Sequence, residues 1–367
     1  MKQIVNHFTD NDLYTFTCMY YVLQKYPRAE TEYQFFDRNR TCYPKGFDLL
    51  LREQLEHLAE VTITDEEREY MPRAFPFLPY WFVNVFLRGF RFNPAELTIT
   101  QDEEGHLDIS VKGKWWSTII WEMPILATIS ELMHILNGDA AKYDAEAEYA
   151  KSLDKGRQIW QGGLTLGDMG TRRRFSFAHQ ERVIDALIQS YREVKDETDG
   201  QCGRFTGTSN VYFAMKKGIP CLGTMSHQCI SFEEIVSGEF ECNYNVMNNW
   251  SEVYDGNVGI FLYDCFGDNV FFGNLSKRMA MTFSGLRIDS GVEEEQVDLI
   301  VEKYKQLGID PMTKQAVFSN GLNIERAIEI HNYCKGKITD SYGVGTFLTC
   351  DVLDCKPMNI VVKLIRG

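Results

Sequence analysis

The chain has 367 residues, of which 13% are aromatic and 25% charged, as expected for a globular protein with two domains or one large one. Its net charge of −14 argues against the broad basic surface that binds nucleic acid or an anionic membrane. No signal sequence and no apolar run of roughly 18 to 20 residues is evident, so we expect a cytoplasmic protein without a membrane span. The ten cysteines contain no CxxC pair and indicate reduced thiols, Cys350 and Cys355 being the closest two.

The first third of the chain mixes helices with antiparallel strands. Its patterns predict, in chain order, a helix capped by Asp10 or Asn11 (residues 10–26), a strand (31–37), an amphipathic helix (48–60), an aromatic core segment (78–87), a hairpin (97–100 and 107–111) and a further strand (117–121).

From residue 125 onward, helices alternate with short strands. The predicted strands are 164–166, 219–222, 258–263, 282–288, 316–318 and 337–340, and the main predicted helices are 125–136, 140–161, 180–194, 293–307 and 324–333. This alternation favours a parallel α/β barrel, with a doubly wound open sheet as the main alternative. Residues 357–364 predict a last strand that returns to the N-terminal sheet.

Residues 206–228 are the most specific stretch of the sequence. Gly207, Thr208, Ser209 and Asn210 predict a glycine turn and a helix start, and the helix ends at Gly218. A brief buried strand, 219–222, then leads to His227. In barrels of this kind catalytic side chains lie on the loops that follow the strands.

Polar residues follow the other predicted strands as well, so one rim of a barrel would collect them. They are Asp168 with Arg172, Arg173 and Arg174; Asp264; Asp289 and Ser290; Ser319, Asn320 and Gly321; and Gly343, Gly345 and Thr346. His227 on such a rim is a base, a phosphoryl acceptor or a structural histidine. The three arginines either bind a carboxylate or phosphate, or form a solvated face.

The remaining candidates have equally open alternatives. The glycines at 343 and 345 with Thr346 either hold a phosphate or make a plain turn. Asp264 and Asp289 either cap helices or bind ribose hydroxyls or a magnesium-bound diphosphate. Tyr14 and Phe175 are aromatic residues beside polar groups, or core residues. Together the candidates indicate a site for a sugar phosphate or a nucleotide.

In several separate stretches the sequence resembles the nicotinate phosphoribosyltransferase family. These stretches are DNDLYTFT, WWSTIIWEMPILATISEL, GTRRRFSFAHQE, GTSNVYFAMKKGIPCLGTMSHQ, GLRIDSG, KYKQLGIDP, YGVGTFLTCDV and KPMNIVVKL, and they cover nearly the whole chain in order. The resemblance implies an N-terminal α/β sandwich domain (residues 1–124, joined by strand 357–367) and an irregular α/β barrel that carries catalysis (125–356).

The resemblance also implies an activity. Phosphoribosyl diphosphate and nicotinate would give nicotinate mononucleotide and diphosphate in NAD salvage, with Mg²⁺ and coupled ATP hydrolysis. His227 matches the transiently phosphorylated histidine, and Asp264 and Asp289 match residues that contact ribose or the magnesium-bound diphosphate. Gly343, Gly345 and Thr346 match the loop that holds the 5′-phosphate, beside the candidates Ser319 and Asn320.

For the acceptor, the resemblance assigns the pyridine pocket to Arg172 or Arg173 and to Arg287. It implies a homodimer with shared active sites, in which Tyr14 of the neighbouring subunit lies against the ring, with Phe175 as a second stacking candidate. Thr208 and Ser209 also belong to the implied substrate site. Ser209 stands where nicotinamide-using relatives carry an aspartate, which favours an acid as acceptor.

Two departures from the family accompany the resemblance. Asn320 and Asn323 stand where aspartates are expected, and relatives continue past the position of Gly367 with a lysine-bearing segment. The alternative functions are a nicotinamide phosphoribosyltransferase and a non-catalytic nucleotide-binding homologue. A metal-dependent barrel hydrolase lacks a convincing set of histidine ligands.

Overall fold

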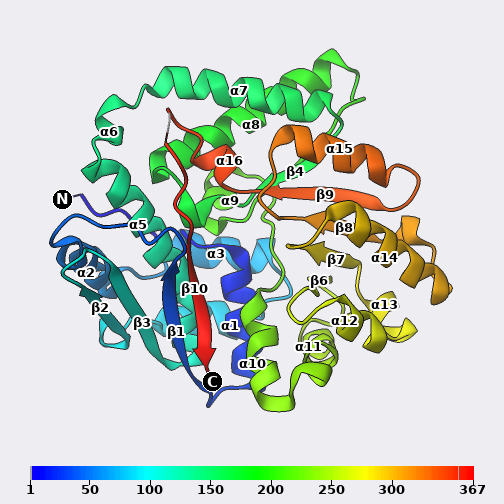
Figure 1. Cartoon of the computed structure of the whole chain (residues 1–367), viewed down its shortest axis with the longest axis horizontal. Coiled ribbons are helices and arrows are strands. Elements are labelled where there is room, and N and C mark those ends of the chain that lie inside the picture. The colour runs from blue at the N-terminus through cyan, green and yellow to red at the C-terminus, as the bar shows by residue number, and fades with distance from the viewer. Residues whose placement is uncertain (1, 354) are drawn as a thin grey trace.

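The computed structural model describes residues 2–353 and 355–367, and it contains two sheets. Figure 1 shows a four-stranded sheet on the left, in the order β10-β1-β3-β2, and a six-stranded sheet on the right, in the order β5-β4-β9-β8-β7-β6. The strands are β1 (Glu30–Asp37), β2 (Leu97–Gln101), β3 (Leu107–Lys114), β4 (Thr165–Asp168), β5 (Arg204–Thr208), β6 (Ile260–Leu262), β7 (Gly285–Ile288), β8 (Gln315–Phe318), β9 (Thr339–Val344) and β10 (Ile360–Arg366).

Sixteen α-helices are present in the described residues. They are α1 (Leu13–Lys25), α2 (Phe47–Glu56), α3 (Asp65–Ala74), α4 (Trp115–Thr118), α5 (Glu122–Leu136), α6 (Asp139–Lys142), α7 (Ala145–Gln161), α8 (Phe177–Glu197), α9 (Val211–Lys217), α10 (His227–Ser237), α11 (Glu239–Tyr254), α12 (Asp268–Asn274), α13 (Lys277–Thr282), α14 (Glu293–Gln306), α15 (Ile324–Cys334) and α16 (Thr346–Thr349). Short 3₁₀ helices (His57–Glu60, Pro94–Glu96, Ile119–Trp121, Thr171–Arg173, Pro311–Thr313) and one π-helix (Phe82–Leu87) complete the set.

The four-stranded sheet is antiparallel, and it confirms the predicted hairpin and the predicted return of the last strand. In β1, Tyr33 and Phe35 point into the core while their neighbours are more exposed, which is the alternation that a sheet with one buried face requires. Strand β10 pairs with β1 along Asp37↔Ile360 to Glu32↔Arg366. The first and last parts of the chain therefore form one sheet, although the division at residues 124 and 356 stays a prediction.

Several predictions in the first third of the chain are wrong. Residues 117–121 are helical rather than a strand, because Ile119, Ile120 and Trp121 are all buried and so carry no alternation. The aromatic segment 78–87 is only partly core, since Tyr80 and Trp81 are exposed. Helix α1 begins at Leu13, so neither Asp10 nor Asn11 is its cap.

The six-stranded sheet is parallel, and it confirms an α/β fold. The predicted strands near 164, 258, 282, 316 and 337 are present, whereas 219–222 makes only a single bridge between Cys221 and Thr208. Strand β5 was not predicted. With that bridge, the strands follow one another around the sheet in the order expected of a barrel wall. The last strand, β9, pairs with the first, β4, as a barrel requires. Among the described residues no pairing joins β6 to 219–222, so a closed barrel stays a prediction.

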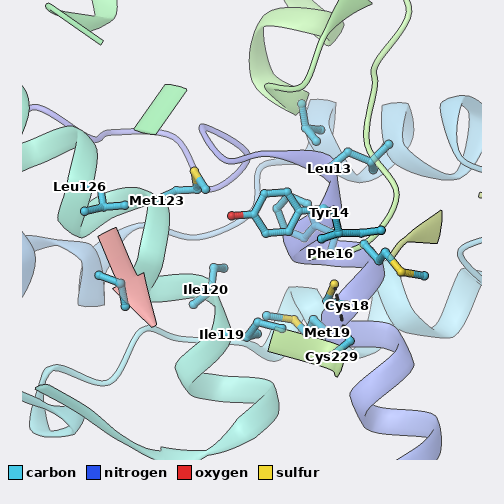
Figure 2. Close-up of a cluster of buried hydrophobic side chains, with 14 of the residues drawn as sticks. Leu13, Tyr14, Phe16, Cys18, Met19, Ile119, Ile120, Met123, Leu126 and Cys229 are labelled. Atoms are coloured by element: carbon cyan, nitrogen blue, oxygen red, sulfur yellow. Dashed lines mark hydrogen bonds between the residues drawn. The ribbon is translucent and has the colours of Figure 1, made fainter. Parts of the chain in front are cut away.

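One large core joins the two sheets. Figure 2 shows Met19 of α1 beside Ile119, with Leu13 and Phe16 of the same helix in the same buried cluster. Residues 115–136 are long and apolar enough to cross a membrane by length and composition, contrary to our expectation, but 78% of their most apolar window is buried inside the protein. They form the α4–α5 stretch of this core.

The start of α1 is bonded to the end of β5. The backbone N–H of Leu13 donates to the carbonyl of Ser209 at 2.8 Å, and that of Val211 donates to Asn11 at 3.0 Å. These bonds hold the residues that precede α1 against the carboxyl ends of the parallel strands.

Candidate active site

A cleft lies at the carboxyl ends of the parallel strands. It consists of two adjoining cavities of about 610 Å³ and 310 Å³, which share Arg172, Arg173, Arg287 and Ser319. Strand β10 lines the larger cavity with Val361 to Leu364. The cleft is therefore bounded by both sheets.

His227, Asp264 and Asp289 meet in the larger cavity, as the sequence predicted. His227 is the first residue of α10, and the two aspartates follow β6 and β7. The Nε2 atom of His227 lies 3.5 Å from Asp264 Oδ1 and 3.7 Å from Asp289 Oδ2. The imidazole is 47% exposed, so it faces the cleft rather than serving as a core residue.

Both aspartates are held in the ionised form. Burial alone would raise the pKa of Asp289, but the charges of Arg287 and His227 outweigh it and lower that pKa to about 2. Burial is likewise outweighed at Asp264, where contacts from His227 and Ser290 lower the pKa. Ser290 Oγ donates to Asp264 Oδ2 at 2.5 Å.

Arg287 and Ser319 form the next part of the cleft wall. Arg287 Nε donates to Ser319 Oγ at 2.8 Å, and its Nη2 donates to Asp289 Oδ1 at 3.3 Å. Ser319 Oγ also donates to Asp289. The guanidinium is thus fixed between two strand ends with donors still directed into the cleft.

Glu122 is a cleft residue that the sequence did not single out. Its Oε2 accepts a hydrogen bond from the Tyr14 hydroxyl at 2.8 Å, and its Oε1 lies 3.4 Å from Arg172 Nη1. Burial raises the pKa of Glu122, and it raises that of Tyr14 well above its usual value. The residue was overlooked because it was placed at the end of a strand that is in fact helical.

The predicted phosphate loop lines the smaller cavity. Gly343 lies near the end of β9, and Gly345 and Thr346 follow that strand; Asn323 lies nearby, while Asn320 lines the larger cavity. A Cβ atom at position 345 would lie 3.2 Å from the carbonyl oxygen of Met169, a tight contact. Glycine there lets the loop lie close to the end of β4.

Three predicted site residues do not line the cleft. Phe175 is buried in a separate small cluster, with its ring stacked on Tyr143 at 5.3 Å, so in this structure it is a packing residue. Thr208 Oγ1 donates to Asp168 Oδ2, and Ser209 Oγ donates to Asp12 Oδ1, both at 2.7 Å. These two hydroxyls bond buried carboxylates behind the cleft and so hold the ends of the strands in place.

Arg174 belongs to the same buried layer. It is fully buried, and its two terminal nitrogens each lie 2.7 Å from a carboxylate oxygen of Asp10. Only Arg172 and Arg173 of the arginine run reach the cleft. The three arginines therefore do not form a solvated face, and they do not all face a bound anion.

Tyr14 reaches the cleft from the same chain. It lines the larger cavity together with His227 and bonds Glu122 of its own chain. A Tyr14 supplied by a neighbouring subunit stays a prediction, beside this placement of Tyr14 in the cleft of its own chain.

The aspartate pair fits a hard divalent cation. Asp264 Oδ1 is buried and has no hydrogen-bond partner among the described residues, its contact with His227 being longer than a good hydrogen bond. Carboxylate oxygens are the ligands that Mg²⁺ prefers, and this ion is usually held by one or two of them plus substrate phosphates.

Comparisons with known proteins agree on one family. The model described as the nicotinate phosphoribosyltransferase (NAPRTase) family matches residues 164–366, and the model of the N-terminal domain of that family matches residues 9–130. A nicotinate phosphoribosyltransferase of Desulforapulum autotrophicum is 36% identical over 99% of this chain and 90% of its own length. Nicotinate phosphoribosyltransferase 2 of Pseudomonas aeruginosa is 36% identical over 99% and 89%.

Solved structures give the same result. The crystal structure of nicotinate phosphoribosyltransferase from Porphyromonas gingivalis superposes with a TM-score of 0.93 at 39% identity and covers 98% of this chain and 90% of that one. The enzyme from Vibrio cholerae superposes with a TM-score of 0.86 at 28% identity, covering 99% and 86%.

Proposed function

This chain belongs to the nicotinate phosphoribosyltransferase family, and we propose that it transfers phosphoribose from phosphoribosyl diphosphate to the ring nitrogen of nicotinate. The products are nicotinate mononucleotide and diphosphate, and the role is in NAD salvage. The observation that carries the proposal is the meeting of His227, Asp264, Asp289 and Arg287 in one cleft whose far end is a glycine loop.

The smaller cavity suits the 5′-phosphate. Backbone groups of Gly343 and Gly345 and the hydroxyl of Thr346 offer hydrogen-bond donors without bulk. Ser319, at the junction of the two cavities, extends this polar wall toward the ribose. The sugar then lies between the phosphate loop and the aspartates.

At C1 of the ribose, the bond to diphosphate breaks as the bond to the pyridine nitrogen forms. The leaving group gathers negative charge, so its stabilisation is the main electrostatic task of the site. Asp264 and Asp289 bind the ribose hydroxyls and would hold Mg²⁺, which when bound neutralises charge on the diphosphate. Arg287 stands beside Asp289 as a fixed positive charge.

The acceptor is selected by charge. Arg172 and Arg173 line the junction of the cavities, and a guanidinium pairs with the carboxylate of nicotinate in a way that an amide cannot match. Tyr14 supplies an aromatic face, held in place by Glu122. Ser209 contributes indirectly, since it holds Asp12 behind the pocket; an aspartate in its place would put two carboxylates in contact.

His227 is proposed to accept the γ-phosphoryl group of ATP. Asp264 faces Nε2 and can accept its proton, which leaves Nδ1 as the nucleophile. A nitrogen–phosphorus bond forms as the bond between the γ-phosphorus and ADP breaks, and water later releases the phosphate. While it lasts, the phosphoryl group adds negative charge beside both aspartates, which can reorganise the diphosphate site.

Further proposals follow from the family. The enzyme works in the cytoplasm with ATP and Mg²⁺. A homodimer is the assembly that the resemblance implies, and in it each cleft would keep the Tyr14 of its own chain.

The test is a product assay combined with labelling. With nicotinate, phosphoribosyl diphosphate, ATP and Mg²⁺ we expect nicotinate mononucleotide, and with γ-labelled ATP we expect an acid-labile label on the protein. His227→Ala should abolish the label and the dependence of turnover on ATP. Gln228→Ala is a control at the adjacent position of the same helix and should still be labelled.

Each alternative has a distinct outcome. Product from nicotinamide alone would assign the chain to nicotinamide-using enzymes, and no turnover with either acceptor would indicate a non-catalytic homologue. Label retained in His227→Ala would remove the phosphohistidine but leave phosphoribosyl transfer in place.

A further inference from the structure

A second group of side chains with metal-ligand atoms lies outside the cleft. His134, Asp139 and Cys355 each offer one ligand atom, and these atoms lie within 4.8 Å of one another. His134 stands in the last turn of α5, Asp139 begins α6, and Cys355 lies in the segment between α16 and β10. Figure 1 shows that α5 leads directly toward α6, so two ligands come from one corner of the chain and the third from a distant part of the sequence.

The imidazole of this group is held in place by its neighbours. His134 is buried, its Nδ1 lies 3.1 Å from Asp139 Oδ2, and its Nε2 lies 3.5 Å from Cys350 Sγ. The ring of Phe175 packs against it at 4.6 Å between centroids. Both ring nitrogens therefore have polar partners, and the ring cannot turn freely.

The ligand types indicate which cation would bind. A thiolate, an imidazole and a carboxylate are the donors of tetrahedral zinc sites, whereas Mg²⁺ and Ca²⁺ take oxygen ligands. Histidines that bind a metal usually make a second hydrogen bond through the other ring nitrogen. Cys350 occupies that second position here.

We propose that His134, Asp139 and Cys355 bind a divalent cation of the zinc class, with Cys350 orienting the imidazole through its far nitrogen. The metal–sulfur bond forms as the Cys355 thiol releases its proton, and the fourth position is left to water. No electron is transferred, so no oxidant is involved.

The position of this site indicates what the cation does. None of its three ligands lines the cleft, whereas Cys350 and Asp351 line the smaller cavity. The cation would therefore fasten the segment between the phosphate loop and β10 to the end of α5. Its effect falls on the stability of that segment, because no ligand contacts the reacting groups.

Cobalt is a suitable probe, because its visible spectrum reports tetrahedral geometry and its near-ultraviolet charge-transfer band reports a thiolate ligand. The full chain, without a histidine tag and kept reduced, is stripped with a chelator and titrated with Co²⁺ and then Zn²⁺. We expect one equivalent of Co²⁺ with both spectral features, displaced by Zn²⁺. Cys355→Ser should lose the charge-transfer band and bind roughly tenfold or more weakly.

Cys202→Ser is the matched control, because Cys202 is also partly exposed and, among the described residues, its sulfur donates a hydrogen bond only to the carbonyl of Gly203. It should bind as the unaltered chain does. Zn²⁺ should raise the melting temperature of the unaltered chain and of this control, but not of Cys355→Ser. Cobalt bound without a thiolate band, or bound equally by Cys355→Ser, overturns the proposal, as does the absence of binding by the reduced chain.

Discussion

Neighbouring arginines can have opposite roles, as Arg172 and Arg174 show. Arg172 lies in the cleft beside Glu122, whereas Arg174 is wholly buried and paired with Asp10 through two bonds. The sequence could not separate them, because the 3₁₀ turn Thr171–Arg173 has no periodicity from which the direction of each side chain can be predicted.

We expect Arg174→Ala to lower the free energy of unfolding by about 3 to 5 kcal/mol, because it leaves the Asp10 carboxylate buried without its cation. Arg173→Ala should change that free energy by less than about 1 kcal/mol, since this side chain lies at the cleft and, in the part of the chain that the structure describes, donates only to the Met358 carbonyl. Urea unfolding measures both free energies, and KM for nicotinate should rise in Arg173→Ala because this guanidinium is proposed to pair with the nicotinate carboxylate. Equal losses of stability would contradict this division of roles.

His179 should make stability depend on pH. Burial, followed by the nearby charge of Lys155, lowers the pKa of His179 from 6.5 to about 4 in the folded protein. Between these values the unfolded chain binds the proton and the folded chain does not, so stability is fully present above pH 6.5 and is lost as pH falls toward 4. The loss approaches about 3 kcal/mol at 1.4 kcal/mol per pKa unit.

Urea unfolding of the unaltered chain and of His179→Gln, measured from pH 7 down toward pH 4, checks this expectation. The difference in free energy of unfolding between the two proteins should narrow as pH falls through this window. His57→Gln is the control, because His57 lies far from His179 in the sequence, in the 3₁₀ helix His57–Glu60. This variant should keep the same dependence of unfolding free energy on pH as the unaltered chain. A slope unchanged in His179→Gln would assign the effect to other groups.

At the scale of elements, the end of β5 depends on Gly207. This residue has φ +105°, and a Cβ atom there would lie 1.9 Å from the carbonyl oxygen of Pro220. The sequence predicted a turn at this place because a glycine inside a short polar strand weakens the strand pattern. In the structure the glycine instead allows 219–222 to lie against β5 through the Thr208–Cys221 bridge.

Gly207→Ala should destabilise the protein by about 3 kcal/mol or more. The backbone at this position would have to move away from the Pro220 carbonyl and also give up its positive φ. Gly218→Ala is the control, with φ +62° and nothing within 4 Å of a built Cβ, and should cost about 1 to 2 kcal/mol. Thermal unfolding of both variants distinguishes steric conflict from the left-handed backbone alone. Similar losses of stability in the two variants would show that the Pro220 backbone moves aside at little cost.

The sequence predicted most strands of the parallel sheet because each is a short apolar run followed by polar residues. For the same reason it placed His227, Asp264 and Asp289 together, since parallel strands bring their carboxyl ends to one edge. It failed where a segment is buried on every side, as at residues 117–121. Thr208, Ser209 and Phe175 were assigned to the substrate site from resemblance, and only packing reveals that they lie behind it or apart from it.

At the scale of the whole molecule, the cleft needs both sheets. Helix α1 contributes Tyr14, and the antiparallel sheet contributes Tyr33 and the β10 residues Val361 to Leu364. The loops after the parallel strands contribute charged groups such as Asp264 and Asp289. The bond between Leu13 and Ser209 fixes one against the other. Both sheets of one chain therefore contribute residues to the cleft.

A single-chain cleft predicts the behaviour of mixed assemblies. Tyr14→Ala and His227→Ala should each have reduced nicotinate phosphoribosyltransferase activity, because Tyr14 and His227 line one cavity of the same chain. When the two variants are co-expressed with different tags and purified as one population, activity should equal the average of the separate preparations, whether or not the chains associate. Shared sites would instead create clefts that contain both native residues, and activity above that average would show that Tyr14 serves a neighbouring subunit.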